Sequence, residues 1–352
     1  MSTIIAFILI FTVVVVSHEF GHYILAKKNG IKVVEFSIGM GPALFKYTKG
    51  DTQYALRILP IGGACLFEGE DGLNKGDDSK ESSTGSFQSA SVLARMSTVF
   101  AGPFFNLILG FLLSLIVVWF SGSDKPVVTG ISEGLPAQEA GLEVGDEIIS
   151  IDGERVHLYR EITLISYLNS GETIEIEYKR DDEKNTIMVT PFYDEEADRY
   201  FIGILGGGEY VDCKSLNVFQ YSYYEVRYWL KYTVKSLFML VQGKVSSDDV
   251  SGPVGMVQVI DQTIEVATPY GLPTVLLTLM NFAILLSVNL AVLNLLPIPA
   301  LDGGRLLFLF IEIIRGKPIP PEKEGIVHFI GFAALMILMV VVLFNDISKL
   351  FV

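Results

Sequence analysis

Four long apolar stretches constrain the fold of this 352-residue chain more than any other feature. They run from Ile4 to Ala26, from about Val92 to Phe120, from about Val275 to Leu296 and from about Ile326 to Phe344. Each is long enough to cross a bilayer as a helix, which takes about 20 residues. With half of its residues hydrophobic, the chain is too apolar for an ordinary soluble enzyme. The sequence therefore predicts a multi-pass α-helical membrane protein with four transmembrane helices.

The basic residues beside these stretches predict their orientation, because short cytoplasmic loops carry an excess of Lys and Arg. Such residues follow the first stretch, open the second and separate the third from the fourth (Lys27, Lys28, Lys32, Arg95, Arg315, Lys317 and Lys323). We therefore expect both termini and the region from about 121 to 275 to be extracytoplasmic. The first and third stretches then run in the same direction. The first stretch has no basic residue ahead of it and no small-x-small cleavage site, so we expect it to be retained.

The region between the second and third stretches accounts for the whole formal net charge of the chain, which is −14. Residues 121–275 contain 26 acidic and 12 basic residues, whereas the rest of the chain is balanced. Nucleic acid is therefore excluded as a partner, since phosphate contacts need clustered Lys and Arg. Within this region, Asn217 to Gln242 is rich in aromatic residues and basic side chains, which predicts an amphipathic helix at the membrane interface. The two cysteines, Cys65 and Cys213, are too few for a disulfide framework.

The first part of this outer region has a strand and turn pattern. From Val127 onward the sequence predicts a strand, a short helix ending at Gly141, another strand and a tight turn at Asp152-Gly153. The portion G-L-x-x-G-D-x-I-x-x-I-D-G resembles a PDZ domain. The resemblance implies an α+β module from about Val127 to Pro191. Such a module binds an extended peptide by strand addition, or it acts only as a spacer or size filter.

The segment from Val33 to Leu66 is rich in Gly and Pro, with strand-like pieces between them. It predicts either a cytoplasmic hairpin or a membrane-associated β-sheet shielded by protein. The expected organisation is then two transmembrane helices with this β-segment (1–120), a PDZ-like domain (121–200), a linker with the interfacial helix (201–275) and the last two transmembrane helices (276–352).

A polar cluster, S-H-E-F-G-H at residues 17–22, interrupts the first apolar stretch. An ionisable residue inside a membrane span costs several kcal/mol, and three lie here within five residues. On a helix, His18 and His22 lie one turn apart on one face, so both imidazoles can bind one metal ion. Glu19 is close enough to reach a metal-bound water. The spacing predicts a zinc hydrolase with Glu19 as general base; the alternative is a pair of core histidines that would need polar partners.

Two histidines leave a catalytic zinc ion one protein ligand short. His157 lies in the outer region and His328 opens the fourth stretch, so neither is expected at the right depth. Asp302 follows the third stretch, where Pro297 and Pro299 end the helix. Because the first and third stretches run in the same direction, we expect Asp302 beside the two histidines. The alternative is an aspartate that caps a helix in a cytoplasmic loop.

Three motifs, in this order, resemble those of the bacterial site-2 protease family of zinc intramembrane metalloproteases. They are H-E-F-G-H at 18–22, A-G-P-F-F-N at 101–106 and N-L-L-P-I-P-A-L-D-G-G at 294–304, with the PDZ-like insert between the last two. The match spans nearly the whole chain. It implies that the two histidines and Asp302 bind one Zn²⁺ ion per chain and that Glu19 activates water.

The resemblance also implies residues that contact the substrate. Asn294 of the third motif, Asn106 of the second and the Gly62-Gly63 pair are expected in this role. The family often has an aromatic–aliphatic pair after the two glycines, whereas this chain has Ala64-Cys65. The resemblance therefore assigns no side-chain roles to these two positions.

The function that the resemblance implies is regulated intramembrane proteolysis. Substrates would be single-span proteins, such as anti-sigma factors and remnant signal peptides, already trimmed by an upstream site-1-type protease. The enzyme would act in the cytoplasmic membrane, in contact with the lipid bilayer, with its active site near the cytoplasmic side. One rival hypothesis is a catalytically inactive membrane scaffold bearing a PDZ domain. Another is a metal transporter, which would need further polar residues in the second and fourth spans.

Overall fold

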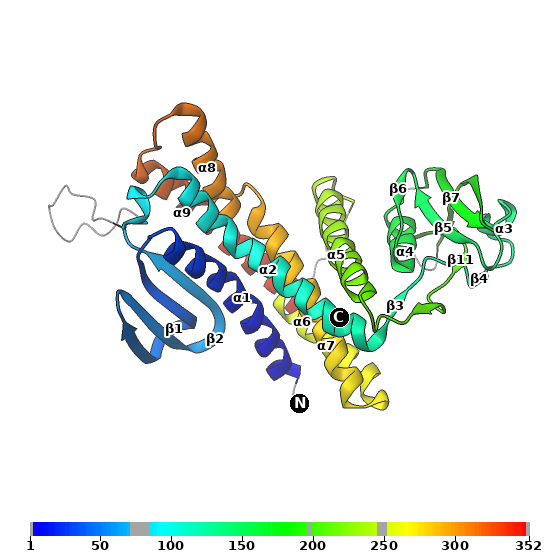
Figure 1. Ribbon diagram of the computed structural model, residues 1–352, viewed down its shortest axis with the longest axis horizontal. Helices are drawn as coiled ribbons and strands as arrows, with labels where there is room; N and C mark the ends of the chain where they lie inside the picture. Colours follow the sequence, from blue (N-terminus) through cyan, green and yellow to red (C-terminus); the bar gives the residue numbers. More distant parts are fainter. Residues whose placement is uncertain (1–2, 71–84, 170, 196–198, 245–251, 350–352) are drawn as a thin grey trace. The chain divides into compact units, whose positions relative to one another are not determined.

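The computed structural model describes residues 3–70, 85–169, 171–195, 199–244 and 252–349. The chain forms two compact units, Met1–Leu113 with Phe238–Val352, and Ser114–Leu237, whose elements are labelled in Figure 1. Each unit has a hydrophobic core of its own. All the site residues predicted from the sequence belong to the first unit.

The four apolar stretches are continuous helices: α1 (Thr3–Lys28), α2 (Val92–Ser121), α7 (Leu272–Leu295) and α9 (Pro321–Ser348). In the described part of the chain, these four are long and apolar enough to cross a membrane, as predicted. In the most apolar 18-residue part of each helix, between 6% and 33% of the residues are buried. Most of their apolar side chains therefore face outward, as in helices surrounded by lipid.

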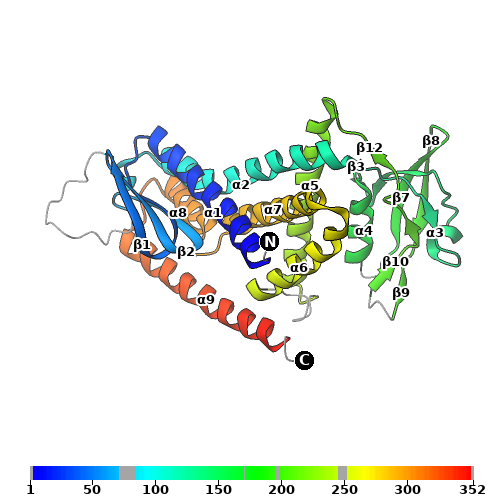
Figure 2. The same cartoon turned by 90° about the horizontal axis from the view of Figure 1, so that it is seen from below.

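Helix α1 packs against both α2 and α7 in the first unit (Figures 1 and 2). Gly21 allows the close approach to α2, because a Cβ atom there would lie 2.4 Å from the carbonyl oxygen of Ala101. Ser287 of α7 donates a hydrogen bond of 2.8 Å to the carbonyl oxygen of Asn106 in α2. Buried apolar side chains of α1, α6 and α7 form a hydrophobic core of this unit (Ala6, Phe7, Ile10, Val14, Ile260, Leu279 and Ala283).

Two further helices of the first unit were not predicted from the sequence: α6 (Pro253–Ala267), followed by the 3₁₀ turn η2 (Thr268–Tyr270), and α8 (Asp302–Arg315). Asp346 of α9 accepts hydrogen bonds of 2.9–3.1 Å from three backbone N–H groups at the start of α6. These groups would otherwise lack partners at a helix N-terminus. The carboxylate therefore caps α6 and ties it to α9.

The segment after α1 is a long antiparallel pair, β1 (Val33–Lys49) and β2 (Thr52–Phe67). Its register places Phe36 beside both Cys65 and Tyr54, so the first half of β1 lies between the two halves of β2. Gly39 makes this folding back possible: its φ is +87°, and a Cβ there would lie 2.4 Å from the carbonyl oxygen of Leu59. A short 3₁₀ turn, η1 (Phe87–Ser89), precedes α2.

The second unit contains a four-stranded sheet in the order β6-β5-β7-β8. Its strands are β5 (Glu147–Ile151), β6 (Glu154–Arg155), β7 (Ile174–Arg180) and β8 (Glu183–Val189). Asp152 and Gly153 both have positive φ between β5 and β6, as the predicted tight turn requires. Alternate residues of β7 point into the core, which also includes residues from the neighbouring elements (Val128, Ala137, Leu142, Ile148, Ile151, Ile162, Ile174, Ile176 and Val189).

Two shorter helices and three short strand pairs also belong to this unit. The helices are α3 (Pro136–Glu139) and α4 (Tyr159–Leu168). The pairs are β3 (Ser123–Asp124) with β12 (Tyr210–Val211), β4 (Gly130–Ile131) with β11 (Ile204–Leu205), and β9 (Phe192–Asp194) with β10 (Arg199–Phe201).

The predicted amphipathic helix exists as α5 (Asn217–Val241). Its polar face is joined to α4 by ion pairs: Arg160 with Glu225 at 2.9 Å and Arg227 with Glu161 at 3.1 Å. Burial raises the pKa of the Glu225 carboxyl, although the Arg160 guanidinium beside it acts in the opposite direction. One acidic and one basic side chain of α5 are thus each paired with an oppositely charged side chain of α4.

Candidate metal centre

The structure brings together the two histidines and the aspartate that the sequence predicted as metal ligands. His18 and His22 lie one turn apart on α1, and Asp302 is the first residue of α8. The Nε2 atoms of the two histidines are 3.1 Å apart. Asp302 Oδ2 lies 3.0 Å from Nε2 of His18 and 3.4 Å from Nε2 of His22. Within the described ranges, these three form the group of ligand-type side chains close enough to hold one ion.

The geometry of these three atoms fits a zinc ion. Atoms that bind a tetrahedral zinc ion at about 2.0–2.1 Å are about 3.3 Å apart from one another. The distances of 3.0, 3.1 and 3.4 Å match this spacing. Asp302 Oδ2 is buried and, despite these short distances, has no hydrogen-bond partner in the described part of the chain. A cation at the common centre would satisfy this oxygen together with both imidazole nitrogens.

Hydrogen bonds behind the imidazoles orient them. Nδ1 of His22 lies 2.9 Å from the carbonyl oxygen of Thr98 in α2, which accepts its proton and leaves the lone pair of Nε2 directed at the centre. Nδ1 of His18 lies 3.5 Å from the side-chain amide of Asn106. Asn106 Oδ1 is buried without a partner in the described residues, and turning the amide over would let this oxygen accept the His18 proton.

Gly102 of α2 lies directly against the two imidazoles. A Cβ atom at this position would be 2.3 Å from Nε2 of His22 and 2.8 Å from Cε1 of His18. No other residue type fits there without moving the rings. The glycine of A-G-P-F-F-N therefore keeps α2 close enough to form one wall of the centre, a role that the motif alone did not reveal.

Glu19 lies on the neighbouring face of α1, beside strand β2. The backbone N–H of Cys65 lies close enough to its carboxylate to interact with it, and Gly63 packs so closely that a Cβ there would lie 3.0 Å from Cγ of Glu19. The carboxylate is near enough to both histidines and Asp302 to interact with them electrostatically. A carboxylate oriented beside a metal centre in this way can serve as a general base.

Comparison with known proteins matches the model of peptidase family M50 to residues 6–338. The chain belongs to peptidase family M50. It is 36% identical to zinc metalloprotease RasP of Shouchella clausii, an alignment that covers all of both chains. It is 34% identical to the regulator of sigma-W protease RasP of Bacillus subtilis, covering 99% of each chain. The family confirms the enzyme class predicted from the sequence, an intramembrane zinc metalloprotease of the site-2 type.

Among solved structures, the PDZ domain of an SdrC-like protein from Listeria innocua matches 25% of this M50 chain and 98% of its own. The two are 27% identical, with a TM-score of 0.22.

The segment between α7 and Asp302 is irregular, as the prolines predicted. Helix α7 ends at Leu295, two residues before Pro297. Leu301 occupies the N-cap position of α8, and no side chain caps that helix. Asp302 is therefore not the capping residue of the alternative interpretation, because its carboxylate points toward the histidines instead.

Of the residues expected to contact substrate, Asn106 is 0% exposed, and its side-chain amide lies 3.5 Å from Nδ1 of His18. Gly62 and Gly63 lie in β2, where Gly63 is next to Glu19 and Gly62 is next to Met40, and Asn294 is half-buried in the last turn of α7.

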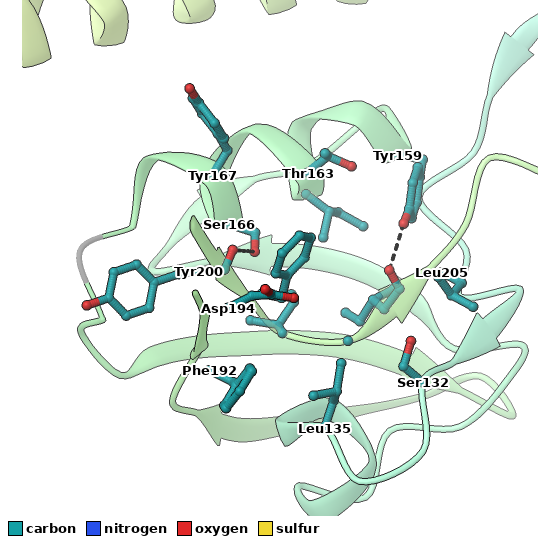
Figure 3. A pocket seen from close by; sticks show the side chains of 15 residues that line it. Ser132, Leu135, Tyr159, Thr163, Ser166, Tyr167, Phe192, Asp194, Tyr200 and Leu205 are labelled. Carbon is teal, nitrogen blue, oxygen red and sulfur yellow. Dashed lines mark hydrogen bonds between the residues drawn. The ribbon is translucent and has the colours of Figure 1, made fainter. Parts of the chain in front are cut away.

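The second unit of this M50 chain has a cavity of about 330 Å³ between α4 and the segment from Tyr200 to Leu205 (Figure 3). Two side chains of α4 cross it to strand carbonyl oxygens: Tyr159 donates to Ile204 at 3.0 Å and Ser166 donates to Tyr200 at 3.4 Å. An added peptide strand would need such carbonyl groups for its own N–H groups. Part of the backbone in this groove is therefore already hydrogen-bonded.

Proposed function

We propose that this chain hydrolyses peptide bonds within the transmembrane segments of single-span proteins, with one zinc ion held by His18, His22 and Asp302. The observation that carries the proposal is the convergence of three ligand atoms, 3.0–3.4 Å apart, inside an apolar helix long enough to span a membrane. Burying an ionisable cluster inside a membrane span costs several kcal/mol, so its presence there indicates a functional site. The zinc metalloprotease relatives support the choice of metal.

The chain's own residues then divide the chemistry between them. When bound, the zinc ion supplies a Lewis acid that polarises the scissile carbonyl and makes water more acidic. Glu19 accepts a proton from the attacking water, whose oxygen forms a bond to the carbonyl carbon. Glu19 then gives that proton to the amide nitrogen as the C–N bond breaks, which restores the carboxylate.

The substrate must be extended to be cut, because a helix hides its carbonyl groups in internal hydrogen bonds. Strand β2 passes beside Glu19 at Gly63 and is paired with β1, and an extended substrate segment would add to it by β-pairing. Asn294, near the end of α7, is the proposed side-chain contact. The name of the Bacillus subtilis relative, regulator of sigma-W protease, supports anti-sigma factors as one proposed substrate class. Remnant signal peptides are the other class that we propose.

The proposed topology places both termini and the PDZ-like module outside the cell membrane, with the metal centre near the cytoplasmic side. The basic residues beside the spans support this orientation. An upstream site-1-type protease would first remove the outer part of each substrate. We favour a size filter over a docking site for the PDZ-like module, because Tyr159 and Ser166 already bind carbonyl groups of its groove.

The decisive experiment compares the wild-type chain with Glu19→Gln on purified single-span substrates in lipid or detergent. Glutamine keeps the size of the side chain but cannot accept the proton. We expect Glu19→Gln to bind zinc as the wild type does and to lose cleavage. Cleavage by Glu19→Gln at the wild-type rate would rule out this mechanism, and absence of zinc from the wild type would favour the inactive scaffold.

A further inference from the structure

The segment that delivers Asp302 to the metal centre contains a strained residue. Ala300 has a φ of +80°, a left-handed conformation in which a Cβ atom crowds the backbone. It lies two residues before Asp302 and directly before the N-cap of α8. A residue with a side chain keeps this conformation only where neighbouring groups hold it.

One of those groups is His328 of α9. The backbone N–H of Ala300 donates a hydrogen bond of 2.8 Å to Nδ1 of His328. The ring of Phe308 on α8 packs beside the imidazole, with 5.6 Å between ring centroids. Because Nδ1 accepts, the ring proton sits on Nε2, which faces the Glu324 carboxylate at 3.8 Å. The imidazole is thus held in the orientation in which Nδ1 accepts the hydrogen bond from the Ala300 N–H group.

The same surface of α9 is shaped to fit the segment. Gly331 lies about one turn after His328, and a Cβ atom there would be 2.5 Å from Cβ of Pro299. On the other side, Gly304 of α8 lies so close to Ile298 that a Cβ would be 2.4 Å from its carbonyl oxygen. The segment before Asp302 is therefore clamped between α8 and α9, and His328 supplies a side-chain hydrogen bond to its strained residue.

We propose that His328 is a positioning residue: through Ala300 it fixes the backbone that presents Asp302 to the zinc ion. The inference rests on the proposed function, since it concerns the third ligand of that centre. His328 does not touch the metal, so it acts only through the segment. Groups that orient metal ligands typically change metal affinity 10–100-fold when they are removed, and we expect about 10-fold here because the contact is one step further out.

Three variants of the full chain test this in detergent, with the rate of zinc release to a chelator as the readout. His328→Leu removes the acceptor and should release zinc about 10-fold faster than the wild type. His328→Asn places an amide oxygen near the position of Nδ1 and should stay close to the wild-type rate. Adding Ala300→Gly to His328→Leu should slow release again, since glycine adopts positive φ without strain. His157→Ala, in the other unit, is the control.

Three outcomes would overturn the inference. Wild-type release from His328→Leu would show that the hydrogen bond positions nothing. Equal acceleration in His328→Asn and His328→Leu would show that ring packing matters and not the acceptor. Failure of Ala300→Gly to rescue His328→Leu would show that the strained residue is not what His328 holds, whereas rescue also proves that the variant folds. If instead the wild type binds no zinc, or binds it without His18 and His22, the proposed function itself fails.

Discussion

A methyl group placed on Gly102 should disrupt the metal centre although no ligand is changed. The Cβ of Gly102→Ala would lie 2.3 Å from Nε2 and 2.5 Å from Cε1 of His22, whereas ordinary contacts are 3.4–4 Å. The imidazole would therefore have to move by roughly 1 Å. A zinc site tolerates ligand displacements of only about 0.2 Å. We expect zinc affinity to fall by at least about 100-fold, the upper range for disturbed ligand orientation, and cleavage to fall with it.

The same helix offers a matched control. Gly110 of α2 faces Val288 of α7, and a Cβ there would lie 3.2 Å from a valine methyl group, which can shift slightly. Alanine is favoured over glycine inside a helix by about 1 kcal/mol, so both substitutions should support α2 itself. Zinc content by atomic absorption and cleavage of a single-span substrate should therefore fall in Gly102→Ala and persist in Gly110→Ala. Full zinc occupancy and normal cleavage in Gly102→Ala would refute the reasoning.

Four further predictions follow from the site and the topology. Alanine at either histidine ligand, or Asp302→Asn, should remove most bound zinc while His157→Ala does not; full occupancy in Asp302→Asn would exclude it as third ligand. Cysteines introduced near Lys75, outside the described residues, should be labelled from the cytoplasm and those near Asp182 from outside, and the reverse pattern would invert the topology. Deleting 127–191 should extend cleavage to substrates with bulky outer domains; loss of cleavage of trimmed substrates would indicate docking instead. Burial lowers the pKa of His157, and the guanidinium of Arg227 lowers it further. The unfolded chain therefore binds more protons than the folded chain as the pH falls below about 6.5, and the second unit should lose stability. The same pH dependence of the melting temperature in His157→Ala would contradict this.

The sequence alone determined the features that depend on local pattern. Length and apolarity predicted four spans, and all four are helices in the described chain. The spacing of His18 and His22 placed two imidazoles on one face because a helix repeats every 3.6 residues. Asp302 was predicted as their partner from the shared direction of two spans and from the prolines before it, and the structure places its carboxylate 3.0 Å from His18.

What the sequence left open depends on distances between residues far apart in the chain. Nothing local distinguishes Gly102 from any other glycine of an apolar helix; its role follows only from the approach of α2 to α1. The resemblance implied Asn106 as a substrate contact, and only the fold shows that its side chain is buried beside His18.

Arg95 shows the same division between local pattern and tertiary structure. As a basic residue beside a span it predicted only a cytoplasmic flank, whereas the fold buries it in an ion pair of 2.6 Å with Glu312 of α8, a helix that was not predicted. His328 was set aside as a ligand because it opens the fourth stretch, whereas the fold places its Nδ1 atom 2.8 Å from the backbone nitrogen of Ala300, two residues before Asp302. These roles arise when helices with weak local signals pack together, because burial and hydrogen bonding are properties of the assembled unit and not of any segment.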